Sequence, residues 1–471
     1  FQAADSTFLG YSLSRTRVTI LQQYIMRKVL FYLLITLSLV KSNAQSYDER
    51  LAAAMNSGDW FALDSIYNAT PKDSISDFIE VYSRCLIGNR LNRPDVSIPA
   101  FTELFNNQAS QLDLNNILNS AMMFAMDLGR TGDNATAGAV INSVLNSTKQ
   151  YLDSATINTF QQQINQYTAL SHYSPYTIKF ESENGKIPFT IASVGKEGHE
   201  SVLMRLTDSY INGMKTDITF DTGAAMNIIS DSLARQFNLI PLNDSGNVTG
   251  IGQASGKLAI AKELKIGNIS ITDVPFLVID VTSNNEEADK FMDCFNIVVG
   301  SELMLRLKDL TLDFVDRHIC IPANPPCKTD IPSNICFSSQ MNLLTNGVIH
   351  NNPMLMCIDS GDASFGSLGS NFYDRNKDFI TSNFKTDTIR TAGIGGVHLS
   401  ECYGMSGLKL TLGNNSVVIP NIIVLLQDSP NGYDCNLGLK TLMLFDKIRF
   451  NLVDFVLTTE PSQCNSVDCL K

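Results

Sequence analysis

The chain has 471 residues, of which 44% are hydrophobic and 17% charged, a composition typical of a globular protein of two or three domains. Its formal net charge of −12 argues against a protein that binds nucleic acid or an anionic membrane, because phosphate recognition depends on clustered Lys and Arg. The ten cysteines and five histidines form no CxxC pair and no HExxH motif. A metal centre is therefore not expected, and nothing in the sequence implies an organic cofactor.

The first 45 residues have the pattern of upstream residues followed by a secretory signal peptide. Met26-Arg27-Lys28 precedes an apolar run over 29–40, and small residues follow at Ser42 and Ala44. A short membrane anchor is the alternative, but this run is shorter than the roughly 20 residues that span a bilayer. We therefore expect export to the periplasm, the cell surface or the medium, with no stable membrane span.

Residues 46–173 have apolar side chains at three- and four-residue steps, which predicts an α-helical domain. Gly-Asp dipeptides separate the predicted helices, for example in SGDWFALDSIY and TGDNATAGAVI. These two stretches loosely resemble the turn-helix units of tetratricopeptide-type repeats, and an irregular helical bundle is an equally good reading. Such a domain could bind a protein partner, cover a cleft or support the rest of the chain.

From residue 174 onward the pattern changes to short β-branched runs separated by Gly and Asn turns, which predicts β-structure. A Pro- and Cys-containing stretch, IPANPPCKTDIPSN, indicates a boundary near residue 330. The sequence thus predicts two mainly β domains, over residues 174–330 and 331–471.

The two β regions contain an internal repeat. Asp221-Thr222-Gly223 ends one apolar run, and Asp359-Ser360-Gly361 ends another in the second region. Each motif is followed by a Gly-Ile-Gly loop and then by an apolar segment that ends in glycine, and these glycines, Gly300 and Gly438, stand equally far from their aspartates. A lone Asp-Thr/Ser-Gly is weak evidence, but two of them in register with the same later motifs indicate duplicated structural units.

This constellation resembles the retropepsin-like aspartic proteases, over roughly residues 174–460. The resemblance implies two acid-protease lobes in one chain, related by a pseudo-twofold axis. It assigns catalysis to Asp221 and Asp359, with support from the four Thr/Ser and Gly residues of the two motifs: Thr222, Gly223, Ser360 and Gly361. It also implies flaps that cover a bound peptide, at Gly250-Ile251-Gly252 and Gly393-Ile394-Gly395.

Aspartic proteases need two carboxyl groups close enough to share one proton, so that one acts as a base on water while the other protonates the peptide carbonyl. Gly223 and Gly361 allow tight turns, and the Thr222 and Ser360 hydroxyls can brace the two loops against each other, as in the family. This chain departs from the family pattern at Asp362, where Ala, Ser or Thr is usual. Asp362 could confine activity to acid pH, mark a degraded second lobe, or point to solvent.

We predict an exported, monomeric aspartic endopeptidase that cleaves a peptide or protein substrate, most readily at acid pH. One alternative is a catalytically silent, two-lobed protein that binds peptides. Another is an interaction protein whose helical repeats bind a partner and whose protease-like part is accessory.

Overall fold

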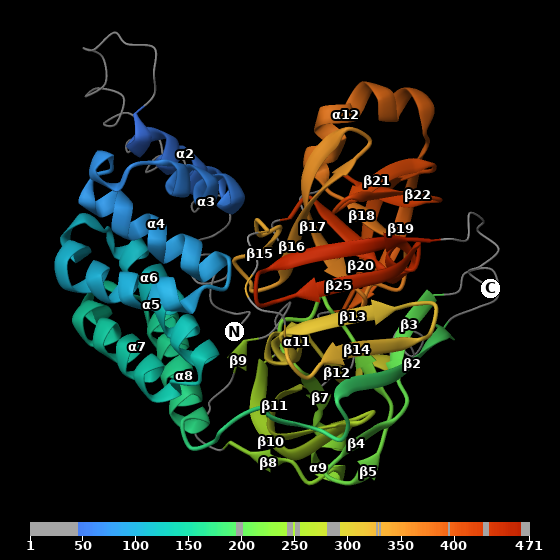
Figure 1. Cartoon of the computed structure of the whole chain (residues 1–471), viewed down its shortest axis with the longest axis horizontal. Coiled ribbons are helices and arrows are strands. Elements are labelled where there is room, and N and C mark those ends of the chain that lie inside the picture. Colours follow the sequence, from blue (N-terminus) through green and yellow to red (C-terminus); the bar gives the residue numbers. More distant parts are fainter. Residues whose placement is uncertain are drawn as a thin grey trace. The chain divides into compact units, whose positions relative to one another are not determined.

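The computed structural model describes residues 46–194, 201–242, 248–249, 255–279, 293–325, 328, 331–393, 396–426 and 433–462. They divide into a helical unit that ends at Tyr167 and a β unit that begins at Thr168, and each unit is described here by itself (Figure 1). The signal segment predicted before residue 46 lies outside the described residues. None of the helices in the described ranges is long and apolar enough to cross a membrane.

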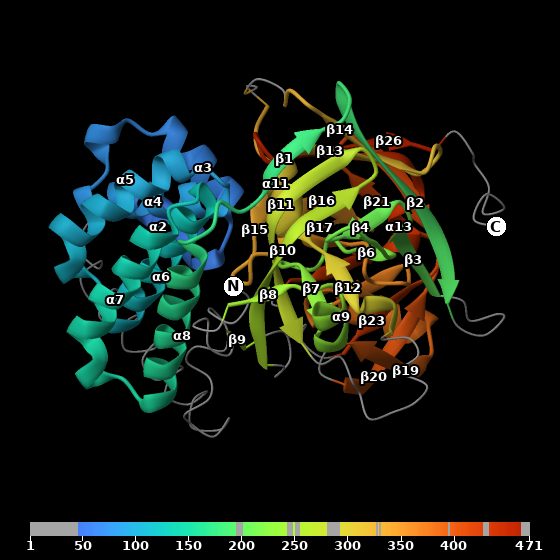
Figure 2. The same cartoon turned by 90° about the horizontal axis from the view of Figure 1, so that it is seen from below.

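The helical unit is built from α-helices, as the sequence pattern predicts, and most of them pack against the next helix along the chain (Figure 2). Fully buried apolar side chains such as Leu51, Leu63, Phe101, Ile141 and Phe160 form its core. The helices are α2 (Tyr47–Ser57), α3 (Trp60–Ala69), α4 (Asp77–Arg90), α5 (Pro94–Glu103), α6 (Leu114–Thr131), α7 (Asn134–Thr148) and α8 (Ser154–Leu170).

The Gly-Asp dipeptides act as helix breaks for a local physical reason. Gly58 and Gly132 have φ of +69° and +94°, the left-handed conformation in which helices commonly end and which favours glycine. The next residue then caps the following helix: the Asp59 and Asp133 side chains accept hydrogen bonds from the backbone N–H groups of Ala62 and Thr136. These aspartates satisfy donors that the first helical turn leaves unpaired.

In the described residues, the β unit contains two sheets. In the larger sheet the order is β26 (Val456–Pro461), β25 (Phe445–Asn451), β13 (Asp309–Asp313), β14 (His318–Pro322), β2 (Asn184–Val194), β3 (Ser201–Leu206), β6 (Ile218–Phe220), β12 (Ile297–Val299), β7 (Ile228–Ser230), β11 (Ile269–Ile279), β10 (Ser255–Ile266), β4 (Ser209–Ile211) and β5 (Met214–Lys215). Off this path, β1 (Thr177–Phe180) pairs with β11, while β8 (Ile240–Pro241) and β9 (Val248–Thr249) pair with β10.

The second sheet has the order β19 (Thr386–Gly393), β20 (Gly396–Met405), β23 (Ile422–Leu425), β18 (Gly366–Leu368), β24 (Cys435–Gly438), β17 (Asn352–Asp359), β16 (Leu343–Ile349), β21 (Leu408–Leu412) and β22 (Asn415–Ile419), with β15 (Ile335–Phe337) paired to β16. A helical region followed by β-sheets is therefore what the sequence predicts and what the structure contains. The sequence did not predict the short helices between strands: α9 (Asp231–Gln236), α11 (Ser301–Leu307), α12 (Ser370–Asn383) and α13 (Leu439–Leu442).

The strands around the two Asp motifs repeat the same arrangement. We call residues 201–322 the first repeat and residues 335–461 the second repeat. In the first, β12 lies between β6, its parallel partner, and β7, its antiparallel partner. In the second, β24 lies in the same way between β17 and β18. The next strands, β11 and β23, also run parallel to β7 and β18 respectively.

The two repeats pair directly with each other through β13 and β25, which lie side by side in Figure 1. The strands are antiparallel, with Leu310 opposite Phe450 and Leu312 opposite Ile448. When the repeats are aligned on their two Asp motifs, Ile448 corresponds to Leu310 and Phe450 to Leu312. The contact between Leu310 and Phe450 therefore has a counterpart, between Leu312 and Ile448, in which the two repeats have exchanged roles. Such reciprocal contacts are the property of an interface across a twofold axis.

Candidate active site

Each Asp motif is fixed by the strand that carries it and by the glycine segment beside that strand. Asp221 directly follows β6, and Asp359 is the last residue of β17. Gly300 and Gly438 stand at the ends of the parallel partner strands β12 and β24. The residue after each glycine ties down the loop that follows the Asp: the Ser301 N–H donates to the Ala224 carbonyl and the Leu439 N–H to the Asp362 carbonyl, both at 2.8 Å.

The two loops brace each other through the hydroxyl groups of Thr222 and Ser360, both fully buried. The Thr222 N–H donates to Ser360 Oγ and the Ser360 N–H donates to Thr222 Oγ1, each at 3.0 Å. The hydroxyls then donate onward across the boundary between repeats, Thr222 Oγ1 to the Ile358 carbonyl at 2.6 Å and Ser360 Oγ to the Phe220 carbonyl at 2.8 Å. These four bonds hold two segments that are distant in the sequence in one rigid unit.

The carboxyl groups of Asp221 and Asp359 face each other across this unit. A Cβ atom placed on Gly361 would lie less than 3.0 Å from Cγ of Asp221, and one on Gly223 equally close to Cγ of Asp359. Glycine is required at both positions because each backbone approaches the opposite carboxyl group too closely for a side chain. The structure thus brings together the two aspartates and the four supporting residues that the sequence singled out.

Backbone N–H groups orient both carboxyl groups. Asp221 Oδ1 accepts from Gly223 at 2.8 Å and from Ala224 at 3.0 Å. Asp359 Oδ1 accepts from Gly361 and Asp362, both at 3.0 Å. The same oxygen is used in both repeats, which leaves the Oδ2 atoms for other partners.

The two carboxyl groups cannot both ionise easily. Burial raises the pKa of Asp221 above the ordinary carboxyl value, although backbone N–H groups oppose the shift. Burial, followed by the negative charges of Asp221 and Asp362, raises the pKa of Asp359 well above that value. Two half-buried carboxyl groups with raised pKa values share a proton over part of the pH range, and the two titration steps belong to the pair.

Asp362, the departure from the family pattern, is half-buried and does not simply point to solvent. Its Oδ2 accepts from Asn436 Nδ2 at 2.8 Å, and its Oδ1 accepts from the backbone N–H and the hydroxyl of Ser364 at 2.9 and 2.7 Å. Asn436 Nδ2 also donates to Asp359 Oδ2 at 3.0 Å. The sequence singled out Gly438 but not Asn436, two residues before it, so the hydrogen bond from Asn436 to Asp359 was missed.

The predicted flap residues are only partly described. Gly250, Ile251 and Gly252 lie outside the described residues, but β9 and β10 on either side of them pair as a hairpin, with Thr249 opposite Ser255. Ile394 and Gly395 also lie outside the described residues. Gly393 ends β19 and pairs with Gly396 at the start of β20. Both predicted flaps therefore coincide with the ends of paired antiparallel strands.

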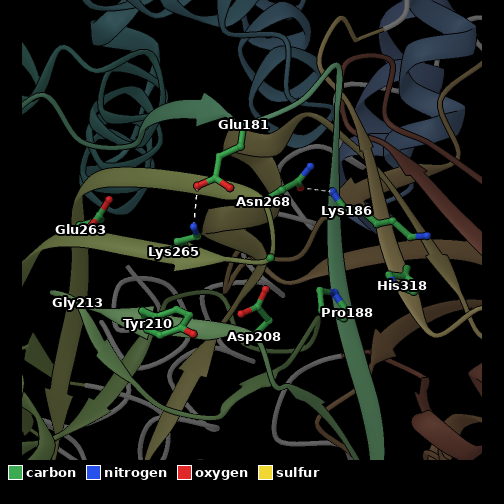
Figure 3. A pocket seen from close by; sticks show the side chains of 11 residues that line it. Glu181, Lys186, Pro188, Asp208, Tyr210, Gly213, Glu263, Lys265, Asn268 and His318 are labelled. Carbon is green, nitrogen blue, oxygen red and sulfur yellow. Dashed lines mark hydrogen bonds and ion pairs between the residues drawn. The ribbon is translucent and has the colours of Figure 1, made fainter.

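A separate pocket of about 540 Å³ lies among residues of β4, β10 and β14 of the first repeat and of β2, which precedes that repeat (Figure 3). Two of its charged groups form an ion pair, Lys265 with Glu181, at 2.7 Å. Asn268 accepts from the Lys186 backbone N–H at 2.6 Å and donates to the Asn184 carbonyl at 2.9 Å. The pocket contains neither Asp221 nor Asp359.

Comparison with known proteins places the first Asp motif in a known domain type. The family model described as "gag-polyprotein putative aspartyl protease" matches residues 207–287. The chain therefore contains a retropepsin-like aspartyl protease domain that includes Asp221, whereas Asp359 lies beyond the matched residues. No curated protein matches the chain.

Three solved structures are similar to part of the chain. The EIAV protease complexed with the inhibitor HBY-793 is 21% identical, with 21% of this chain and 83% of that chain covered and a TM-score of 0.15. The retroviral protease-like domain of Ddi1 from Leishmania major is 15% identical, with 26% and 95% covered and a TM-score of 0.19. A retropepsin-like aspartic protease from Rickettsia conorii is 10% identical, with 30% and 96% covered and a TM-score of 0.19.

Proposed function

We propose that the β unit is a single-chain aspartic endopeptidase in which the two repeats form two lobes and each supplies one catalytic carboxyl group. One observation carries this proposal: the carboxyl groups of Asp221 and Asp359 face each other, held by reciprocal hydrogen bonds between Thr222 and Ser360. Two carboxyl groups that share one proton supply both a base and an acid to the same peptide bond.

The reaction follows from that pair. The ionised carboxylate removes a proton from a water molecule as the water oxygen attacks the carbonyl carbon, and the protonated carboxyl group gives its proton to the carbonyl oxygen. In the second step the peptide nitrogen takes a proton from the dyad and the C–N bond breaks, while one hydroxyl of the tetrahedral intermediate returns a proton. The dyad ends with the single proton with which it began, and the products are a carboxylic acid and an amine.

The substrate we propose is an extended peptide segment. The paired strands next to the two Gly-Ile-Gly loops would lie against such a segment and add backbone hydrogen bonds to it. We further propose that the protein is exported and acts as a monomer, since both carboxyl groups come from one chain. The helical unit is the candidate site for a protein partner.

Cleavage of an unfolded protein tests the proposal. The purified protein is assayed from about pH 3 to 8, across the range in which paired carboxyl groups titrate, with Asp221→Asn as the test variant. The matched control is Asp217→Asn, which removes an exposed carboxylate from the same stretch of chain. We expect Asp221→Asn to abolish cleavage and Asp217→Asn to leave it unchanged. A folded parent that cleaves nothing at any pH would overturn the proposal in favour of a silent, peptide-binding protein.

A further inference from the structure

The two repeats differ at two positions beside the dyad. When they are aligned on their Asp motifs, the first repeat has Ala224 and Val298 where the second has Asp362 and Asn436. The backbone is the same in both, because Ala224 and Asp362 accept equivalent hydrogen bonds from Ser301 and Leu439. An apolar pair in one repeat is thus replaced by a hydrogen-bonded polar pair in the other.

The polar pair contacts only one member of the dyad. Asn436 Nδ2 donates to Asp359 Oδ2 at 3.0 Å and to Asp362 Oδ2 at 2.8 Å, so one amide nitrogen bridges the two carboxyl groups. The amide oxygen of Asn436 is buried and has no hydrogen-bond partner in the described part of the chain. The amide is therefore positioned by its two carboxylate contacts.

We propose that Asp362 and Asn436 are positioning residues that make the dyad asymmetric, so that the shared proton stays on Asp359 and Asp221 is the base that activates water. The inference rests on the proposed function and assigns a separate role to each aspartate. The charge of Asp362 disfavours ionisation of Asp359, and Ala224 exerts no such effect on Asp221. Asn436 divides its two N–H groups between the carboxyl groups of Asp359 and Asp362, so it holds the extra charge close to Asp359.

The other titratable groups around Asp359 do not offset this charge. Cys357 lies on the same strand and Cys435 on the neighbouring strand β24, and burial raises the pKa of both thiols, which keeps them neutral below about pH 8. Tyr433 forms a hydrogen bond with Cys357. Asp221 and Asp362 therefore supply the charges that act on Asp359, and each raises its pKa by more than the hydrogen bond from Asn436 lowers it.

A consequence is that activity extends to higher pH than it would without Asp362. The dyad works only while it holds one proton, and the upper limit of activity is the pH at which that proton is lost. The negative charge of Asp362, which is bridged to Asp359 through the amide nitrogen of Asn436, moves this upper pH limit upward by about one pH unit or more. The effect of Asp362 is thus opposite to the confinement to acid pH that its position in the sequence suggested.

The test converts the second repeat to the composition of the first with the double substitution Asp362→Ala and Asn436→Val, and compares the pH profiles of kcat/KM. We expect the high-pH side of the profile to move down by about one pH unit at most, because losing the Asp362 charge outweighs losing the Asn436 hydrogen bond, which by itself lowers the pKa of Asp359. Asp362→Asn, which removes the charge with little change in volume, should shift this side of the profile in the same direction. If the high-pH side of the kcat/KM profile stays in place in both variants, the inference is overturned.

Thermal unfolding separates this inference from the proposed function, because it needs no activity. A carboxyl group whose pKa is raised in the folded state destabilises that state progressively as pH rises above about 4. The double variant should therefore gain Tm relative to the parent as pH rises from about 4 to 8. A constant difference in Tm across this range would overturn the inference even if the parent cleaves peptides. An inactive parent with the expected gain would overturn the proposed function and the role of Asp221 as a base, but not the placement of the shared proton on Asp359.

Discussion

The two repeats share the same backbone arrangement but differ in the side chains beside the two catalytic carboxyl groups. Thr222 and Ser360 make equivalent hydrogen bonds in opposite directions, and β13 and β25 pair in a register that is unchanged when the repeats are exchanged. Beside the carboxyl groups, however, the first repeat has Ala224 and Val298 at the positions where the second repeat has Asp362 and Asn436. The comparison teaches that the backbone brings two carboxyl groups together symmetrically, whereas neighbouring side chains decide which of them keeps the proton.

The largest effect that would test the symmetric framework comes from the two glycines. Gly223→Ala and Gly361→Ala each place a Cβ less than 3.0 Å from the opposite carboxyl group, which must then move. Because misplacing a reacting group by about 1 Å costs on the order of 100-fold, both variants should lose at least about that much of kcat/KM.

Gly404→Ala is the matched control, since its nearest neighbour would lie 3.9 Å from the new Cβ, and it should retain the parent rate. If one of the variants Gly223→Ala and Gly361→Ala kept full activity while the other lost it, the two repeats would not position the carboxyl groups equivalently, and the prediction would be contradicted.

A smaller effect is expected from the bracing hydroxyls. Thr222→Ala leaves the Ser360 N–H and the Ile358 carbonyl without their partner, and Ser360→Ala does the same to Thr222 and Phe220. Each substitution should lower the free energy of unfolding by about 2–3 kcal/mol, the cost of leaving buried polar groups unpaired, as measured by urea denaturation.

The conservative variants Thr222→Ser and Ser360→Thr keep a hydroxyl group and should cost less than about 1 kcal/mol. A large loss in one alanine variant and none in the other would show that the brace is not reciprocal.

The smallest effect is expected where the repeats meet, at the ion pair between Lys447 on β25 and Asp313 on β13, whose atoms are 3.3 Å apart. Burial alone would raise the pKa of Asp313, but the Asp316 backbone N–H and Lys447 outweigh it and lower the pKa. A lowered carboxyl pKa stabilises the fold above the ordinary value of about 4, and this stabilisation is lost as pH falls.

Lys447→Met should therefore reduce stability by up to about 0.5 kcal/mol at pH 7, a partly exposed pair being screened by solvent, and by less at pH 3. Thermal unfolding at the two pH values measures this, with Lys409→Met as the exposed control. A loss that is equal at both pH values would exclude the ion pair as its cause.

Asp221 and Asp359 could be predicted as a pair because the sequence motif that contains each of them is local and occurs twice. Asp-Thr/Ser-Gly at the end of an apolar run marks a strand followed by a tight turn, and the glycine that closes the later apolar segment marks the partner strand. The structure adds that β6 pairs in parallel with β12 and β17 with β24, which the sequence did not predict. Short, continuously apolar runs such as Ile297–Val299 are typical of strands buried on both faces.

What could not be predicted depends on contacts across the fold. No local pattern shows that β13 pairs with β25 rather than with strands of its own repeat alone. Helix α12 was missed because its sequence SNFYDRNKDFITSN is polar and buries only Phe372 and Ile380. The role of Asn436 did leave a signal: it replaces Val298 in the same alignment in which Asp362 replaces Ala224, and a joint change from apolar to polar indicates contact.

The most direct test of the account is whether the two aspartates act as one unit. The measurement is kcat/KM for cleavage of an unfolded protein by Asp221→Asn, by Asp359→Asn and by the double variant, at the optimum pH of the parent. Groups that act together give losses that do not add. We predict that each single variant loses at least about 1,000-fold and that the double variant is no worse. Substantial activity in either single variant, or a further loss in the double variant, would contradict a shared site.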